Sequence, residues 1–170
     1  MKTVIKSNAS QYLAIAGLAC FLAASSASAI AQDASSKQII GSRADYTSAH
    51  VLTLPAGTLY RQDQKESDLR RYGCAYEVND KAALDSLVDL LRNAGIVDEP
   101  PFSAGIDARF VIYLRSGTSQ PVKLVFTQNV GDNPAHGIYN DSLSVRANED
   151  FAAAMRRWTA QQVSAAPCRP

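Results

Sequence analysis

The alternation of apolar and polar residues is most regular between residues 109 and 127, where two apolar runs flank a polar turn at 116–120. Successive side chains of a strand point to opposite faces, so each run would place every second residue on one apolar face. These residues are Phe110, Ile112, Leu114, Val122, Leu124 and Phe126. The pattern predicts a β-hairpin with one packed face and one mixed face, and the mixed face carries Tyr113 and Arg115.

Two other stretches, 81–94 and 149–163, have apolar residues at helical spacing. Apolar residues three and four apart lie on one side of a helix and form a stripe that packs against the core. The stripes consist of Leu84, Leu87, Val88 and Leu91 in the first stretch and Phe151, Ala154, Met155 and Trp158 in the second. Asn79 and Asn148 are the expected N-caps of these helices, and Gly95 is the expected stop of the first.

Short apolar runs at 50–54, 72–78 and 138–146 predict further strands, with weaker signals at 38–41 and 58–61. The resulting order is strand, helix, hairpin, strand and helix. Because strands adjoin one another and do not alternate strictly with helices, this order favours an α+β fold over a parallel doubly wound one. We expect an antiparallel β-sheet of about four to five strands with two helices packed on one face and one disulfide.

The first 31 residues have the pattern of a cleaved signal peptide. Two lysines, Lys2 and Lys6, precede an apolar run at 12–24 that is too short to span a membrane. Small residues at Ala29 and Ala31 favour cleavage before Gln32, with cleavage after Ala29 as the alternative. We therefore expect export to the periplasm or the medium.

The rest of the chain predicts a polar lead-in at 32–48 and a single domain at 49–170, with no transmembrane segment in the mature chain. A lipoprotein anchored through Cys20 is the alternative to a cleaved leader, although the sequence before Cys20 is not the usual lipoprotein signal. Loss of residues 1–31 leaves 139 residues with 15 Lys and Arg against 16 Asp and Glu. A nearly neutral domain without a basic stripe argues against nucleic acid as the partner.

Two cysteines, Cys74 and Cys168, remain in the expected mature chain. An even cysteine count in an exported domain predicts a disulfide between them, and two free buried thiols are the alternative. Tyr72 and Tyr76 flank Cys74 at alternate positions. They would either line the core around the disulfide or lie on the mixed face of the sheet.

The loop at 131–137 carries the only residues with a visible pattern for catalysis, Asp132, Asn133 and His136. A histidine can act as a base that an aspartate orients, but two glycines and Asn133-Pro134 are also ordinary turn chemistry. The two histidines of the chain are far apart in sequence, and no phosphate-binding or dinucleotide motif is present. The sequence therefore predicts no metal and no cofactor.

Tyrosine and arginine on an open sheet face, together with polar loops on a rigid scaffold, are typical of protein interfaces. The candidate contact residues are Tyr113, Arg115, Gly117, Asp132, Asn133 and His136. We predict a small exported protein-binding domain, an inhibitor or immunity protein against a cell-wall enzyme or toxin, whose partner is another exported protein. The alternatives are a small periplasmic hydrolase that uses the 131–137 loop and a structural module of the cell envelope.

Overall fold

The structure is a computed structural model that describes residues 39–40, 45–55, 61–102, 105–128 and 133–162. The chain divides into two units, residues 1–34 and 35–170, and every described residue belongs to the second. The predicted leader, its cleavage site, Cys20, Asp132 and Cys168 lie outside the described residues, so the predictions that rest on them stay predictions.

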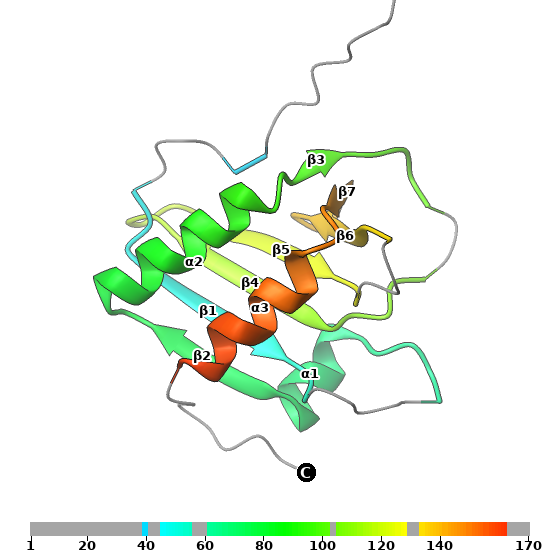
Figure 1. Ribbon diagram of the computed structural model, residues 1–170, viewed down its shortest axis with the longest axis horizontal. Coiled ribbons are helices and arrows are strands. Elements are labelled where there is room, and N and C mark those ends of the chain that lie inside the picture. The colour runs from blue at the N-terminus through cyan, green and yellow to red at the C-terminus, as the bar shows by residue number, and fades with distance from the viewer. Residues whose placement is uncertain (1–38, 41–44, 56–60, 103–104, 129–132, 163–170) are drawn as a thin grey trace, which may run out of the picture. The chain divides into compact units, whose positions relative to one another are not determined.

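The second unit is built on an antiparallel sheet in the order β2-β1-β4-β5-β6-β7-β3 (Figure 1). Its strands are β1 (Ser48–Thr53), β2 (Cys74–Val78), β3 (Val97–Asp98), β4 (Phe110–Arg115), β5 (Val122–Phe126), β6 (Ala135–Tyr139) and β7 (Leu143–Ala147). The helices are α1 (Glu66–Tyr72), α2 (Lys81–Asn93) and α3 (Phe151–Ala160). The predicted α+β class with an antiparallel sheet is confirmed. The expected four to five strands and two helices are wrong, because the described residues form seven strands and three helices.

The predicted hairpin forms the centre of the sheet. Strands β4 and β5 pair in a register that places Ile112 opposite Leu124 and Tyr113 opposite Lys123. Gly117 has a φ of 54° in the connecting turn, a left-handed conformation that glycine adopts without steric cost. The apolar face is buried as expected, and Ile112 and Leu124 are both fully inaccessible to solvent.

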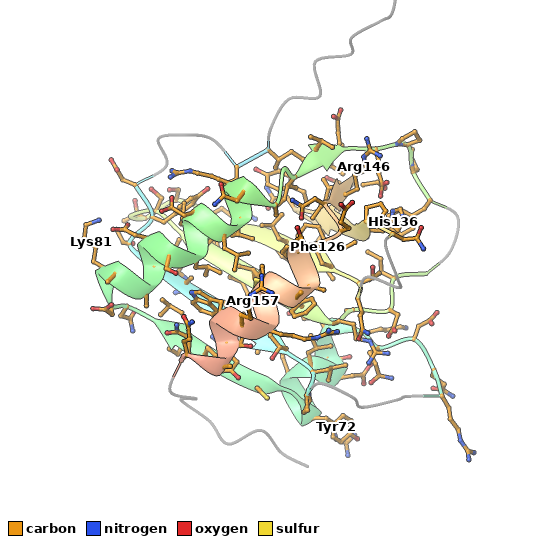
Figure 2. The ribbon with its side chains drawn as sticks, in the orientation of Figure 1. Tyr72, Lys81, Phe126, His136, Arg146 and Arg157 are labelled. Atoms are coloured by element: carbon orange, nitrogen blue, oxygen red, sulfur yellow. The ribbon has the colours of Figure 1, made fainter. Side chains whose placement is uncertain are left out.

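Helices α2 and α3 cover one face of the sheet and enclose the main core (Figure 1). The ring of Phe151 in α3 packs against Phe126 and Phe110, with ring centroids 4.4 and 5.6 Å apart, and Phe126 is labelled in Figure 2. Aromatic pairs such as those of Phe151 add about 0.5–1.5 kcal/mol beyond the area they bury.

The N-cap of α2 is Asp80, whose carboxylate accepts a hydrogen bond from the Ala83 N–H at 2.9 Å. The expected cap, Asn79, lies one residue too early.

The N-cap position of α3 is occupied by Asp150, two residues after the predicted cap Asn148. The Asn148 amide donates a hydrogen bond to the Asn93 carbonyl at 3.0 Å, and its backbone N–H donates to the Ala94 carbonyl at 2.8 Å. Gly95 follows α2 with a φ of 59°, as predicted for a helix stop. Asn148 therefore joins the end of α2 to the start of α3.

The region after β5 contains a second hairpin that the sequence pattern did not indicate. Strands β6 and β7 occupy 135–147, where we predicted the end of a loop and a single strand at 138–146. Asn140 and Asp141 both have positive φ, 47° and 61°, as the centre of a tight hairpin turn requires. A Cβ on Gly137 would lie 2.4 Å from the Val125 carbonyl oxygen, so this glycine lets the strands come together.

The third helix, α1, which the sequence pattern did not indicate, packs against the other face of the sheet. Leu69 is its buried residue and packs in a small apolar cluster with Leu52 and Val111. Tyr72, which is labelled in Figure 2, ends this helix. Its relative exposure is 39%. Tyr76 is buried in the main core, so it does not share the outer face with Tyr113.

Cys74 is buried in β2 within the main core. It is the one cysteine among the described residues, so no disulfide joins two of them. Its pairing with Cys168 stays a prediction.

Candidate functional site

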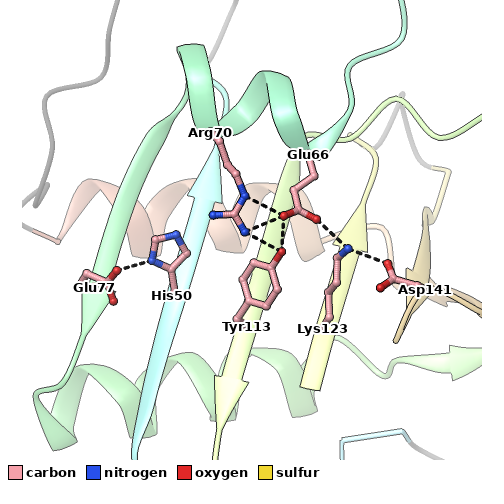
Figure 3. Close-up of polar contacts among 7 residues, drawn as sticks. All are labelled: His50, Glu66, Arg70, Glu77, Tyr113, Lys123 and Asp141. Carbon is pink, nitrogen blue, oxygen red and sulfur yellow. Dashed lines mark hydrogen bonds and ion pairs between the residues drawn. The ribbon is translucent and has the colours of Figure 1, made fainter. Parts of the chain in front are cut away.

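The sheet face opposite α2 and α3, which we call the outer face, carries a row of polar side chains across four neighbouring strands (Figure 3). The register places Glu77 opposite His50, His50 opposite Tyr113 and Tyr113 opposite Lys123. Directly opposed residues of antiparallel strands point to the same face and lie side by side. Residues 10 to 73 positions apart in sequence thus form one continuous row.

Helix α1 places Glu66 and Arg70 over this row, four residues apart and therefore on one side of the helix. The Tyr113 hydroxyl donates a hydrogen bond to the Glu66 carboxylate. The Arg70 guanidinium donates to Glu66 Oε1 at 2.7 Å and to the Tyr113 oxygen at 3.0 Å, and it lies 5.5 Å from the centre of the tyrosine ring. The two side chains of α1 therefore hold Tyr113 from above, as Figure 3 shows.

Lys123 extends the network to the β6–β7 turn. Its ammonium lies 2.7 Å from Glu66 Oε2 and 2.6 Å from Asp141 Oδ1. The turn is anchored to β5 as well, because the Asn140 side chain accepts a hydrogen bond from the Lys123 N–H at 2.8 Å. Helix α1, the central hairpin and the second hairpin thus meet at one carboxylate, that of Glu66.

The network shifts the ionisation of its members in the directions expected from their contacts. Partial burial raises the pKa of Glu66, but hydrogen bonds from Lys123, Tyr113 and Arg70 outweigh it and the pKa falls to about 2. Partial burial lowers the pKa of Lys123, but hydrogen bonds to Asp141 and Glu66 outweigh it and the pKa rises to about 12. Burial and the hydrogen bond to Glu66 raise the pKa of Tyr113. Glu66 and Lys123 therefore stay charged throughout the physiological range.

His50 occupies the next position of the row. Its Nδ1 lies 2.5 Å from the Glu77 carboxylate, and its ring centroid lies 6.1 Å from that of Tyr113. Its Nε2 is buried and finds no hydrogen-bond partner in the described part of the chain. The carboxylate of Glu77 thus fixes the orientation of the imidazole beside the tyrosine.

Two shallow hollows lie on either side of Tyr113 and Pro121. The first, which we call the lysine hollow, has a volume of about 480 Å³ and includes Glu66, Lys123 and Asp141 in its lining. The second, which we call the arginine hollow, has a volume of about 310 Å³. It is lined by His50, Arg70, Glu77, Tyr113, Arg115 and Pro121.

Of the residues that the sequence indicated, Tyr113 and Arg115 are brought together in the arginine hollow. Gly117 lies in the turn beyond the end of β4, and Asn133 is exposed just before β6. His136 is exposed but lies within strand β6, not in a loop.

Among the described residues, the carboxylate beside His136 is that of Glu99, whereas Asp132 lies outside them. The His136 Nδ1 lies 2.9 Å from the Glu99 carboxylate, and its ring centroid lies 6.0 Å from that of Phe102. The Thr127 N–H donates a hydrogen bond to the His136 carbonyl, which places His136 four residues along β5 from Lys123, a separation of roughly 13 Å. His136 and Tyr113 therefore belong to different parts of the outer face.

Six members of this site are not among the residues that the sequence indicated. They are His50, Glu66, Arg70, Glu77, Lys123 and Asp141. Lys123 shares the mixed face of the predicted hairpin with Tyr113, and Glu66 and Arg70 have the spacing of a helical ion pair. Interleaved charges such as those around Glu66 are also typical of a solvated segment, so the spacing alone does not single these residues out.

Comparison with known proteins gives no relative from which a function could be transferred. No protein-family model matches the chain, and neither a curated protein nor a solved structure matches it. Within the described ranges, no group of three or more His, Cys, Asp and Glu side chains is arranged to hold a metal ion. None of the helices described is long and apolar enough to cross a membrane.

Proposed function

We propose that the protein is a small exported binding domain and that its partner is another exported protein. In this proposal the partner docks on the outer face of the sheet around Tyr113 and Arg115. The observation that supports it best is that Tyr113 is already fixed without a partner. Its hydroxyl is hydrogen-bonded to Arg70 and Glu66, and its side chain lines both hollows. Tyrosine and arginine are the residue types that most often dominate binding energy at protein interfaces.

The fixed geometry of the site favours binding because ordering a side chain on association costs about 0.5–1.5 kcal/mol. Glu66 and Lys123 are already immobilised by two or more charged contacts each. The sheet beneath them is rigid, since residues of β4 and β5 are buried on both faces. Inhibitors commonly bind with little movement of the interface backbone, and a pre-ordered surface of this kind suits an inhibitor or immunity protein.

Export enters the proposal through the signal-peptide pattern of residues 1–31, with cleavage before Gln32. A disulfide between Cys74 and Cys168 belongs to the same proposal, since exported domains of this size commonly carry one. It would attach the end of the chain to β2 at the side of the main core.

The test is affinity capture from the cell envelope fraction with tagged protein, purified after expression of the full chain. We expect one stoichiometric protein partner that withstands moderate salt. Tyr113→Ala should reduce its recovery, and Arg157→Glu on the exposed side of α3 should leave it unchanged. Absence of any partner, in an experiment that recovers a known periplasmic pair, would refute the proposal.

A second candidate, a hydrolase, is favoured by the contact between His136 and Glu99. A partly buried carboxylate that orients an exposed histidine is a common arrangement for a general base, and the Glu99 side chain is 11% exposed against 47% for that of His136. In this alternative Glu99 takes the role that the sequence analysis assigned to Asp132. Replacement of His136 by Ala should then abolish hydrolysis of cell-envelope substrates, whereas it should alter partner binding at most locally if the first proposal holds.

A further inference from the structure

The arginine hollow presents guanidinium N–H donors that no described residue engages. The guanidinium of Arg115 makes no hydrogen bond or ion pair with any described residue, although it carries five N–H donors. Arg115 stands two residues from Tyr113 on the same strand, so both side chains point to the outer face. A fully charged group is thus presented at the rim of a concave surface.

Arg70 contributes to the same hollow from the opposite side. Its Nε and Nη2 atoms are engaged with Glu66 and Tyr113, and its Nη1 has no partner in the described ranges. Its side chain is 52% exposed, so a ligand can reach the free edge of the guanidinium. The bonds to Glu66 and Tyr113 fix the plane of the guanidinium.

The two hollows differ in how their charges are balanced. In the lysine hollow, the ammonium of Lys123 is flanked by two carboxylates, Glu66 and Asp141, and needs no external anion. In the arginine hollow the one carboxylate is that of Glu77, and it is engaged by His50. Among the lysine and arginine residues that line the two hollows, Arg115 is therefore the one without a counter-charge from a described residue.

We propose that the arginine hollow binds a side-chain carboxylate, an Asp or Glu of the partner protein, through Arg115 and the free edge of Arg70 beside the ring of Tyr113. This inference rests on the proposed function and specifies the chemistry of the partner. Guanidinium groups match a carboxylate with two parallel N–H···O bonds, which are among the stronger hydrogen bonds in proteins. The nearby Glu77 carboxylate favours a singly charged ligand over a phosphate dianion, because like charges repel.

The test uses an acidic peptide as a probe of the hollow. Protein labelled with ¹⁵N and purified after expression of the full chain is titrated with acetyl-Glu-Glu-Glu-amide, with acetyl-Gln-Gln-Gln-amide and with inorganic phosphate. We expect saturable shifts of the Arg115 and Arg70 Nε–H signals and of the Tyr113 amide with the Glu peptide, and no saturable shift with the Gln peptide. Arg115→Gln should weaken binding of the Glu peptide by about fivefold or more, as expected for loss of a charge-assisted contact.

The matched control is Arg157→Gln, which removes an exposed arginine of α3 and should change the affinity by less than about twofold. The proposal is overturned by equal shifts with the Gln peptide, by tighter binding of phosphate, by an unchanged affinity of Arg115→Gln, or by no saturable shift at all. Envelope capture separates this proposal from the proposed function. A partner retained equally by the wild type and Arg115→Gln would support the binding function and refute the carboxylate site. Peptide binding at the hollow without any captured partner would refute the binding function and support the carboxylate site.

Discussion

The replacement of Glu66 by Gln is the most direct test of the network on the outer face. The fall in its pKa from the ordinary value of 4.5 to about 2 corresponds to roughly 3 kcal/mol if the carboxylate were fully coupled to its partners. The side chain is 24% exposed and its partners are partly solvated, so water screens the ion pairs. We therefore expect Glu66→Gln to lower the free energy of unfolding by about 1–2 kcal/mol at pH 7.

The pH dependence of this loss identifies its cause. The pKa of Glu66 is lower in the folded protein than in the unfolded chain, so its contribution is complete above about pH 5 and is lost as the pH falls through about 2. By linkage, roughly 40% of the contribution remains at pH 3. The difference in stability between wild type and Glu66→Gln should shrink accordingly.

The measurement is urea unfolding of the wild type and the variant at pH 7, 5, 4 and 3, followed by circular dichroism. Glu149→Gln is the control, because Glu149 is exposed ahead of α3, and its replacement should cost less than about 0.5 kcal/mol. An equal loss at pH 7 and pH 3 would show that the cost comes from packing and not from charge. A loss at pH 7 no larger than that of the control would refute the role of the network in stability.

Three further predictions concern single features. Tyr113→Phe keeps the ring but removes the hydroxyl, so the free energy of unfolding in urea should fall by about 1 kcal/mol, and an unchanged value would contradict the hydrogen bonds described. Gly137→Ala would force a Cβ to within 2.4 Å of the Val125 carbonyl oxygen, so we expect a loss of about 2 kcal/mol or more in thermal unfolding, and near-wild-type stability would show that the hairpin can shift. Mass spectrometry of non-reduced peptides should find Cys74 linked to Cys168, a bond worth up to about 4–5 kcal/mol, whereas two free thiols would contradict it.

The features that the sequence predicted well are those in which a local pattern and its environment agree. Residues 110–114 are an unbroken run of apolar and aromatic residues and form a central strand, and helix α2 has an uninterrupted apolar stripe and a clear stop at Gly95. In both cases the residues that form the buried face belong to one short segment of the chain. Short-range spacing is then sufficient to identify the element.

The features that the sequence did not predict are those whose local residue pattern does not match the conformation they adopt. Ala135, His136 and Gly137 have the composition of a turn, yet they form a strand because Gly137 allows close approach to Val125. Helix α1 has a single buried apolar residue, Leu69, so no hydrophobic period could reveal it. Tertiary contacts decide the conformation in both segments.

The candidate site was predictable only in part, for a related reason. Tyr113 and Arg115 could be placed on the outer face from alternation alone. Their contacts with Glu66 and His50 join residues 47 and 63 positions apart, and such pairs follow from strand order and helix placement. The pattern of a single sequence does not specify the strand order of the sheet or the position of α1 on it.

The placement of α1 explains why stability and proposed binding depend on the same carboxylate. A helix of seven residues is not stable by itself in water, so α1 needs contacts outside its own backbone. Leu69 supplies one apolar contact, and Glu66 supplies the hydrogen bonds and ion pairs that reach β4 and β5. If Leu69 alone attached the helix, Arg70 could rotate away from Tyr113, and ordering it on binding would cost about 0.5–1.5 kcal/mol. The charges that fasten this short helix to the sheet are therefore also the contacts that orient an arginine toward the hollow.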